Sequence, residues 1–284
     1  MKTISYLGPE NTNTYFAARK KFGSKAKYVH APTVEDVFQA IEREQADFGV
    51  VPIENSLEGA VTHTLDRFLD FRQSPVRIYG EIDQPIQHHL IMRKETPEDD
   101  IHIIYSHPQA FAQCRHWLEK HYSRAVRRER DSTADAIKDL LDEKEKSWDL
   151  NARAAIGRLE LAEDNDLKSI PIPVERENRT RFLIISLRVP KRGGRSKTSL
   201  MVALKDKPGA LHDTLVPFKN NRINLTKIES RPSKEKVWEY IFFIDFEGHE
   251  SDLRVKKTLE ALKRSVTVLR VLGSYPVGGV RGRR

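Results

Sequence analysis

The chain has 284 residues, of which 38% are hydrophobic and 32% are charged, a composition typical of a folded globular protein and not of a disordered or fibrous one. Its length exceeds what one hydrophobic core usually fills, so we expect one large and one small domain. The formal net charge of +8 raises nucleic acid as an alternative partner, because clustered basic residues supply most sequence-independent affinity for DNA.

The positive excess is confined to two short stretches, which argues against a basic recognition face. The first stretch surrounds a Pro- and Gly-containing segment that has the composition of a linker, and the second is the C-terminal tail. Eight residues account for the whole excess: Arg188, Lys191, Arg192, Arg195, Lys197, Arg281, Arg283 and Arg284. We therefore expect no nucleic-acid partner.

Nothing in the sequence indicates a membrane segment or a secretion signal. No apolar run approaches the roughly 18 residues that a membrane helix needs, and the first residues pass directly into a strand-like segment. We expect a cytoplasmic protein without a membrane partner. The single cysteine, Cys114, cannot form an internal disulfide and is expected to be a small buried hydrophobe within a helix.

Short β-rich runs alternate with amphipathic helical stretches in the first 80 residues, which predicts an α/β fold with a mostly parallel sheet. Thr33 and Asp36 have the spacing of a capping box that opens a helix reaching Ile41. The other predicted elements are strands at 4–7, 28–30 and 48–53 and helices at 14–22 and 57–71. Ligands bind at the strand ends of such sheets.

The next hundred residues repeat this pattern and predict a second lobe. Predicted strands lie at 76–82, 86–92 and 101–105, and predicted helices run from Pro108 to about 122 and from Ser132 toward Leu141. A last apolar strand at 181–187 could return to the first lobe. A chain that crosses between lobes and comes back leaves a cleft suited to a small substrate.

A linker at 189–197 separates this region from a smaller predicted domain at 198–276, which is followed by a basic tail at 277–284. The smaller domain is expected to contain strands at 198–204, 225–230, 238–246 and 266–272 and helices at 209–219 and 252–263. This βαββαβ order is that of a ferredoxin-like domain.

Four short polar motifs lie at predicted strand or helix ends. Each one alone is what a turn or a helix cap requires, so a structural role is sufficient for each. Together they place hydroxyl and amide groups, and helix N-termini suited to carboxylates, at the kind of position that lines an α/β cleft. They are Gly8-Pro9-Glu10, Glu54-Asn55-Ser56, Ser106-His107-Pro108-Gln109 and Asn178-Arg179-Thr180-Arg181-Phe182.

Longer stretches around these motifs resemble, in order, the motifs of the prephenate dehydratase family. They are Tyr6–Glu10, Val51–Gly59, Ser106–Cys114 and Thr180–Phe182, and the later Gly209–Leu211 and Glu229–Pro232 resemble the phenylalanine-binding motifs of the attached ACT domain. The resemblance implies a two-lobed, periplasmic-binding-protein-like catalytic domain at 1–188, with lobes at about 1–80 plus 170–188 and at 81–169. It also implies a ferredoxin-like ACT domain. No chorismate mutase domain precedes Tyr6, so we expect the monofunctional form.

The resemblance implies a lyase of phenylalanine biosynthesis that converts prephenate to phenylpyruvate, water and carbon dioxide without a cofactor. The residues to which it assigns catalysis are Thr180, Asn55, Gln109 and Glu54, and the expected substrate-binding residues are Thr12, Ser56, Ser106 and Arg181. A threonine hydroxyl is a very weak acid, so a hydrogen-bond donor or proton relay is favoured over a free general acid. For Glu54 a purely structural role is an equal alternative.

By the same resemblance the ACT domain binds phenylalanine as an effector between two paired copies, which implies a homodimer or a homotetramer. The expected effector-binding residues are Gly209, Ala210, Leu211, Asn224, Glu229, Ser230 and Arg231. The structural alternative is that the glycine only starts a helix and that the later run only ends a strand.

Two places depart from the family pattern. Asn11-Thr12-Asn13 stands where relatives have Gly-Thr followed by an aromatic residue; Asn11 is expected to keep the turn, because asparagine tolerates positive φ. Asn13 replaces the aromatic residue and leaves the packing of the pocket open. His88-His89 is a benign difference and predicts no metal site, because adjacent strand residues point to opposite faces.

Two rival functions stay open. An arogenate dehydratase performs the same elimination on a substrate with an amino group in place of the keto group. A non-catalytic amino-acid-binding protein would use a cleft and an ACT domain without chemistry.

Overall fold

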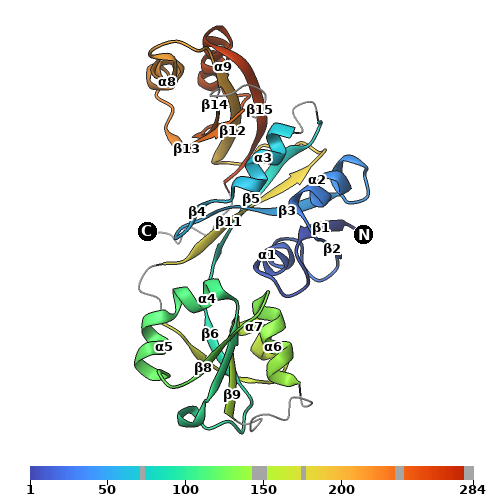
Figure 1. The fold of residues 1–284 in the computed structure, drawn as a ribbon. Coiled ribbons are helices and arrows are strands. Elements are labelled where there is room, and N and C mark those ends of the chain that lie inside the picture. Colours follow the sequence, from blue (N-terminus) through green and yellow to red (C-terminus); the bar gives the residue numbers. More distant parts are fainter. Residues whose placement is uncertain (71–73, 143–151, 174–176, 234–239, 278–284) are drawn as a thin grey trace. The chain divides into compact units, whose positions relative to one another are not determined.

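The computed structural model describes residues 1–70, 74–142, 152–173, 177–233 and 240–277. The chain divides into two compact units (Figure 1). The first contains Met1–Gly8, Ala17–Gln84 and Thr180–Arg284, and the second contains Pro9–Phe16 and Pro85–Arg179. Among the described residues, no helix is long and apolar enough to cross a membrane.

The N-terminal sheet of the first unit has the strand order β2-β1-β3-β11-β5, with the short β4 beside β3. Its strands are β1 (Thr3–Leu7), β2 (Lys27–Ala31), β3 (Phe48–Asn55), β4 (Gly59–Ala60), β5 (Arg77–Pro85) and β11 (Arg179–Ser186). The strand β1 is parallel to β2 and β3, whereas β11 pairs antiparallel with β3. The expected return of the last strand to the first lobe is therefore confirmed, and it brings two segments 125 residues apart into contact.

Three helices accompany this sheet: α1 (Asn13–Phe22), α2 (Val34–Glu42) and α3 (Thr62–Asp70). The predicted capping box of α2 is present: Thr33 accepts the Asp36 N–H at 3.1 Å, and the Asp36 carboxylate accepts the Thr33 N–H at 3.1 Å. The predicted helix over 57–71 was wrong at its start. A turn and β4 precede α3, because Gly59, with φ 86°, lets the chain reverse and pair with Asn55 at the end of β3.

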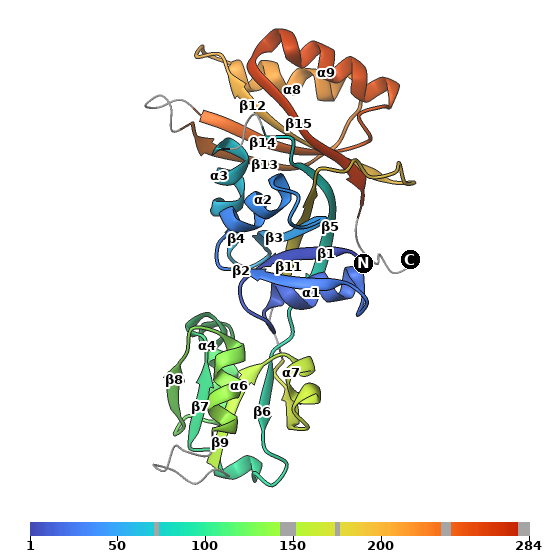
Figure 2. The same ribbon diagram turned by 90° about the vertical axis from the view of Figure 1, so that its right-hand side faces the viewer.

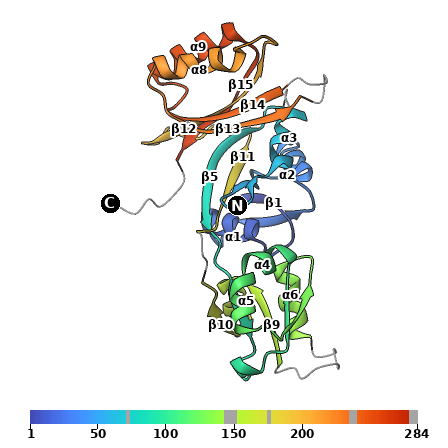
Figure 3. The same ribbon diagram turned by 60° about the vertical axis from the view of Figure 1, so that its left-hand side comes forward.

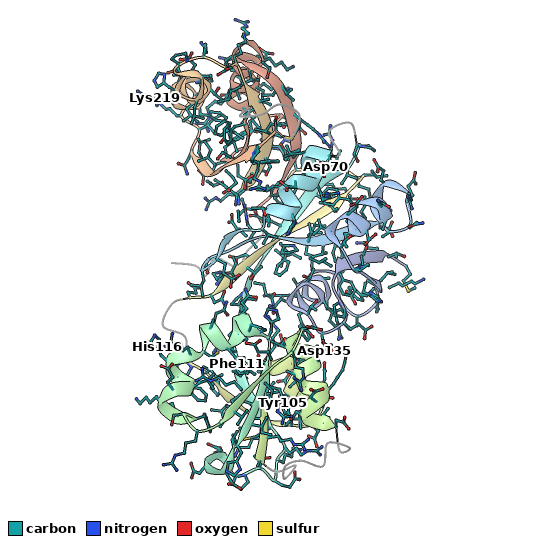
Figure 4. The ribbon with its side chains drawn as sticks, in the orientation of Figure 1. Asp70, Tyr105, Phe111, His116, Asp135 and Lys219 are labelled. Carbon is teal, nitrogen blue, oxygen red and sulfur yellow. The ribbon has the colours of Figure 1, made fainter. Side chains whose placement is uncertain are left out.

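The second unit has its own five-stranded sheet, in the order β10-β6-β9-β7-β8. Its elements are β6 (His89–Met92), a 3-10 helix (Glu98–Asp100), β7 (Ile103–Ser106), α4 (Pro108–Gln113), α5 (Arg115–His121), β8 (Val126–Glu129), α6 (Thr133–Leu141), β9 (Arg153–Gly157), α7 (Leu159–Asp164) and β10 (Lys168–Pro171). The helix α6 packs on β7 and β9 (Figure 2). Tyr105 and Phe111 lie inside this unit, whereas His116 lies at its surface (Figure 4).

Two expectations for this region need correction. The single helix predicted from Pro108 to about 122 is two helices, interrupted at Cys114. The lobe boundaries also differ, because β5 carries the first unit to Gln84, and β10, which pairs with β6, keeps the segment before Thr180 in the second unit.

The C-terminal domain has the predicted βαββαβ order and an antiparallel sheet, β13-β14-β12-β15. Its elements are β12 (Ser196–Leu204), α8 (Ala210–Asn220), β13 (Leu225–Pro232), β14 (Tyr240–Glu247), α9 (Leu253–Ser265) and β15 (Val266–Pro276). The helices α8 and α9 lie side by side on one face of this sheet (Figure 3).

The C-terminal sheet is buried on both faces, which explains the almost continuous apolar run of β14. Leu200, Ile244 and Phe246 pack in a cluster with residues of α8 and α9. On the other face, Met201 and Phe243 belong to a cluster that continues into the N-terminal sheet and its helices. The N-terminal sheet and the C-terminal sheet of the first unit therefore share one core.

Arg192 and Arg195 of the linker, and Arg188 just before it, are mostly exposed, as the composition predicts, although they form ion pairs with Asp252, Glu247 and Asp47. Lys197 at the end of the linker differs, because it pairs with Glu81. The side chain of Lys197 is only 11% exposed and lies in β12. The tail residues Arg281, Arg283 and Arg284 lie outside the described residues.

Gly273 of β15 lies directly against the backbone of β5 in the N-terminal sheet. A Cβ atom at this position would lie 2.2 Å from the carbonyl oxygen of Ile78 in β5, and this oxygen is a backbone atom. Gly194 offers a matched comparison, because a Cβ there meets nothing within 4 Å.

We expect Gly273→Ala to destabilise the first unit, since the new methyl group must push the two strands apart. Overpacking of this kind costs about 1–3 kcal/mol. Denaturant unfolding followed by circular dichroism should show a lower midpoint for Gly273→Ala and an unchanged midpoint for Gly194→Ala. Equal midpoints for the two variants would show that the contact between β5 and β15 is not tight in solution.

Candidate active site

Thr180 and Asn55 lie opposite each other at the ends of β11 and β3. The Asn55 amide Nδ2 donates a hydrogen bond to the Thr180 Oγ1 at 3.0 Å. Thr180 is only 9% exposed. Two polar side chains that the sequence places far apart are thus held together by antiparallel strand pairing.

The second half of the Asn55 amide fixes its orientation. Its Oδ1 accepts the backbone N–H of Leu57 at 2.9 Å and that of Glu58 at 3.2 Å. Because the oxygen faces this turn, the NH2 group faces Thr180. The Thr180 oxygen therefore acts as an acceptor toward Asn55, and its own hydrogen is left for another acceptor.

Gln109 and Ser106 lie in the second unit, on either side of the N-terminus of α4. His107 caps this helix, since its Nδ1 accepts the Gln109 N–H at 3.2 Å, and the Gln109 side chain is exposed. Ser106 is fully buried, and its Oγ donates to the carbonyl oxygen of Ile156 at 3.2 Å. The hydrogen of the Ser106 hydroxyl is therefore used within the protein, and the expected binding of substrate at this helix start stays a prediction.

A polar network in the second unit was missed by sequence reasoning. The Gln113 Oε1 accepts the Asn178 amide at 3.0 Å and lies 2.7 Å from the His88 Nε2. Since an amide oxygen can only accept, His88 carries its proton on Nε2. Burial lowers the pKa of His88, so the ring is neutral near pH 7. The signals in the sequence were the positions of Asn178 and Gln113 within two of the motifs and of His88 at a departure from the family pattern.

The loop that departs from the family pattern keeps its turn. Asn11 has φ 67°, the left-handed value that asparagine tolerates, so the expectation for Asn11 is confirmed. The Thr12 Oγ1 donates to the Pro9 carbonyl oxygen and accepts the Tyr15 N–H, which starts α1. The Asn13 Oδ1 accepts a hydrogen bond from Arg158 at 3.0 Å.

Arg181 lies among three carboxylates, and this arrangement argues against its predicted contact with substrate. Its guanidinium contacts Asp245 at 2.8 Å, Glu54 at 3.1 Å and Glu81 at 3.3 Å, and its side chain is 12% exposed. Burial alone would lower the pKa of Arg181, but Asp245 and the other anionic groups more than offset it and raise the pKa. The charge of Arg181 is already balanced inside the protein. Glu54 is likewise paired, with Arg181 and with Lys227, which fits its structural alternative.

The residues expected to bind an effector lie on two segments of the C-terminal domain. Gly209 caps α8 with φ 77°, and Ala210 and Leu211 follow in its first turn. The carbonyl oxygen of Asn224 accepts the Glu247 N–H just before β13. Glu229, Ser230 and Arg231 lie on β13. The Arg231 guanidinium forms a two-pronged ion pair with Asp66 of α3, at 3.1 and 3.4 Å.

Neither a metal centre nor a reactive thiol emerges from the side chains that the structure places. Within the described ranges, no three His, Cys, Asp or Glu residues gather as metal ligands would. Cys114 is buried, and burial raises the pKa of its thiol to about 12, so the predicted role as a small buried hydrophobe is confirmed.

Comparison with known proteins identifies the family of this chain. The family profile described as "Prephenate dehydratase" matches residues 4–189, and the profile described as "ACT domain" matches residues 198–264. The chain belongs to the prephenate dehydratase family. The expected α/β fold class with a C-terminal ACT domain is thereby confirmed as well.

Relatives of this family cover almost the whole chain. It is 44% identical to the bifunctional chorismate mutase/prephenate dehydratase of Pseudomonas aeruginosa, over 96% of this chain and 73% of that protein. It is 38% identical to the prephenate dehydratase of Methanocaldococcus jannaschii, over 97% and 98% of the two chains. The solved prephenate dehydratase of Arthrobacter aurescens, in complex with L-Phe, is 34% identical with a TM-score of 0.84, over 96% of this chain and 89% of that one.

The variant Asn55→Asp is expected to separate two functions of this side chain. Aspartate keeps an oxygen for the N–H groups of Leu57 and Glu58, but it cannot donate to Thr180 and instead draws the Thr180 hydroxyl hydrogen toward itself. We expect turnover of prephenate to fall at least about tenfold, a loss of about 1.4 kcal/mol, with an unchanged unfolding midpoint. Asn55→Ala, the comparison variant, should lower both the turnover and the unfolding midpoint. Turnover of Asn55→Asp within twofold of the parent chain would contradict this role.

Proposed function

We propose that this chain converts prephenate to phenylpyruvate with Thr180 at the point of catalysis. Prephenate dehydratase activity is what the family and the matching relatives indicate. The observation that carries the assignment of Thr180 is its hydrogen bond from the Asn55 amide, which leaves a buried hydroxyl able to donate to a leaving group.

In this reaction the ring C–O bond and the bond to the ring carboxylate both break. The electron pair of the C–C bond enters the ring, which becomes aromatic, and the carboxylate leaves as carbon dioxide. The oxygen leaves with the electron pair of the C–O bond and takes a proton to become water. Aromatisation drives the reaction, so the protein needs no electron sink and only assists departure of the hydroxyl group.

Thr180 is suited to that assistance as a hydrogen-bond donor and proton relay. A threonine hydroxyl is too weak an acid to act as a free proton source, but the Asn55 N–H stabilises negative charge that develops on its oxygen. Burial strengthens both interactions, because the local dielectric is low. A proton from solvent restores the hydroxyl after each turnover.

We assign orientation of the substrate to groups at turn and helix starts. Gln109 and Thr12 precede or open helices, where N–H groups and the helix dipole favour carboxylates, and Ser56 follows Asn55 in an exposed turn. The hydroxyls of Thr12 and Ser106 are bonded within the protein, so these two positions are assigned through the N–H groups of the helix starts that follow them. Arg181 is left out because its guanidinium is paired with three carboxylates.

Thr180→Val keeps the shape of this side chain and removes its hydroxyl. We expect the variant to fold normally and to lose turnover at least about a hundredfold, the lower range of acid–base effects. Thr180→Ser retains the hydroxyl and should keep more than about a tenth of the turnover. Formation of phenylpyruvate from prephenate, followed by absorbance, measures both. Near-normal turnover of Thr180→Val would remove Thr180 from the mechanism.

The same assay tests the proposed function itself. Purified chain is mixed with prephenate and, separately, with arogenate, and the aromatic products are identified. Faster formation of product from prephenate supports the proposal. Product from arogenate alone would show that arogenate, and not prephenate, is the substrate. No product from either, in a folded protein, would favour the non-catalytic binding protein.

We also propose that phenylalanine regulates this activity through the ACT domain, in a cytoplasmic homodimer or homotetramer. The support is the match to the ACT profile and a relative solved with L-Phe. The positive φ of Gly209 leaves an open backbone at the start of α8, where no side chain blocks a ligand. The prediction for Asn224, Glu229, Ser230 and Arg231 rests on the family pattern of β13.

Phenylalanine titrated into the chain should release or absorb heat and change the rate of turnover. An effector can shift an equilibrium only by its differential affinity for two states, so binding and the change of rate must occur over the same concentrations. Calorimetry and the rate assay with tryptophan as the comparison ligand measure this. Absence of heat and of any change in rate would reject regulation by phenylalanine.

A further inference from the structure

A buried cluster of six charged side chains joins the catalytic sheet to the ACT sheet. The catalytic sheet contributes Glu54, Glu81 and Arg181, and the ACT sheet contributes Lys197, Lys227 and Asp245. Five of these side chains are at most 12% exposed, and Glu54 is 35% exposed. This feature is separate from the family motifs for the effector.

The centre of the cluster is two stacked cross-strand pairs. Arg181 and Glu54 lie opposite each other on β11 and β3, and Lys227 and Asp245 lie opposite each other on β13 and β14. The pairs have reversed polarity, so that Arg181 meets Asp245 at 2.8 Å while Lys227 meets Glu54. Each charge therefore has an opposite charge beside it and another across the interface.

The remaining members fix the geometry of these two pairs. Lys197 holds both oxygens of Glu81, at 3.0 and 2.8 Å. Asp245 accepts the Ser199 hydroxyl at 2.6 Å, and Ser199 lies 2.8 Å from the Tyr275 hydroxyl. Burial raises the pKa of Tyr275, and the Asp245 carboxylate adds to this effect, so the phenol stays protonated.

The cluster is neutral only when the two sheets are together. The catalytic side carries two carboxylates and one guanidinium, a net charge of −1, and the ACT side carries two ammonium groups and one carboxylate, a net charge of +1. A buried charge that loses its partner is strongly destabilising. If the ACT sheet shifts, Arg181 and Glu54 must therefore move with it to stay paired with Asp245 and Lys227.

Arg181 and Glu54 are the chain neighbours of the catalytic pair. Thr180 and Asn55 form the next cross-strand pair on the same two strands. Because neighbouring strand residues point to opposite faces, the catalytic pair lies on the reverse side of the sheet from the charged pair. The register between β11 and β3 shifts between Arg181 and Phe182, so the pairing of the two strands is irregular next to the charged pair.

The effector motif lies on the same strand as one half of the cluster. Lys227, Glu229 and Arg231 alternate along β13 and are all partly buried, whereas the residues between them are exposed. The strand that carries the expected effector residues thus contacts Glu54 through Lys227, which lies two residues before Glu229.

We propose that Asp245 and Lys227 are positioning residues for the dehydratase reaction, which set the Thr180–Asn55 hydrogen bond through Arg181 and Glu54 and transmit effector binding to it. This inference rests on the proposed function. It assigns to the charged cluster a role beyond adhesion, since the shared apolar core and the pair between Arg231 and Asp66 also hold the interface.

The test compares Asp245→Asn with Asp66→Asn in the full chain. Both are the same isosteric loss of one charge at the interface of the ACT and catalytic sheets, but Asp66 pairs with Arg231 whereas Asp245 pairs with Arg181. Turnover is measured per folded enzyme, with the unfolding midpoint measured in parallel. Lys227→Gln supplies a second variant should Asp245→Asn fail to fold.

We expect Asp245→Asn to lower kcat about tenfold with a KM for prephenate within twofold of the parent, because substrate-binding groups are untouched. The change of rate caused by phenylalanine should be lost as well. Asp66→Asn should keep kcat within twofold, even if its midpoint falls. In a double-mutant cycle with Arg181→Met, the effects of Asp245→Asn and Arg181→Met on kcat should be strongly non-additive.

Three outcomes would overturn the inference. If Asp245→Asn and Lys227→Gln keep the kcat of the parent chain, the cluster only holds the sheets together, while the proposed function stands. If Asp66→Asn lowers kcat as much as Asp245→Asn does, any loosening of the interface is sufficient and the cluster has no special role. If the parent chain shows no turnover of prephenate, the proposed function fails first and the inference falls with it.

Discussion

The antiparallel pairing of β11 with β3 is the constraint on which the site depends. It joins two strands that are distant in the sequence and places Thr180 within hydrogen-bonding distance of Asn55, which lies 125 residues earlier in the chain. The same two strands place Arg181 against Glu54 on the reverse face. One register thus creates the polar pair suited to chemistry and the charged pair that meets the ACT domain.

The ACT domain is a structural part of the first unit. Its helices cover one face of its sheet, and the other face shares a core with the catalytic sheet. Asp245 lies on that second face between the buried residues Ile244 and Phe246, where an unpaired charge would be costly. Arg181 of β11 balances it across the interface, at 2.8 Å.

Much of the fold could be read from the sequence, because local patterns suffice for it. The capping box of α2, the βαββαβ order and the burial of Cys114 each depend on a few neighbouring residues and were predicted correctly. The start of α3 was not, because the chain first reverses at Gly59 and pairs with the end of β3. The bonds of Ser106 to Ile156 and of Arg181 to Asp245 could not be read from the sequence, since these partners lie 50 and 64 residues away.

The sequence by itself determined the family, the order of the elements and the residue types at the strand and helix ends, because motifs and periodicity are local properties of the chain. Only the tertiary structure decided which of those polar groups bond to one another and which pair with residues of the ACT sheet. Hydrogen bonds and ion pairs between distant strands depend on register, and a shift of one residue would turn every side chain to the other face. That is why Thr180 and Asn55 meet, and why Arg181 belongs to the ACT interface.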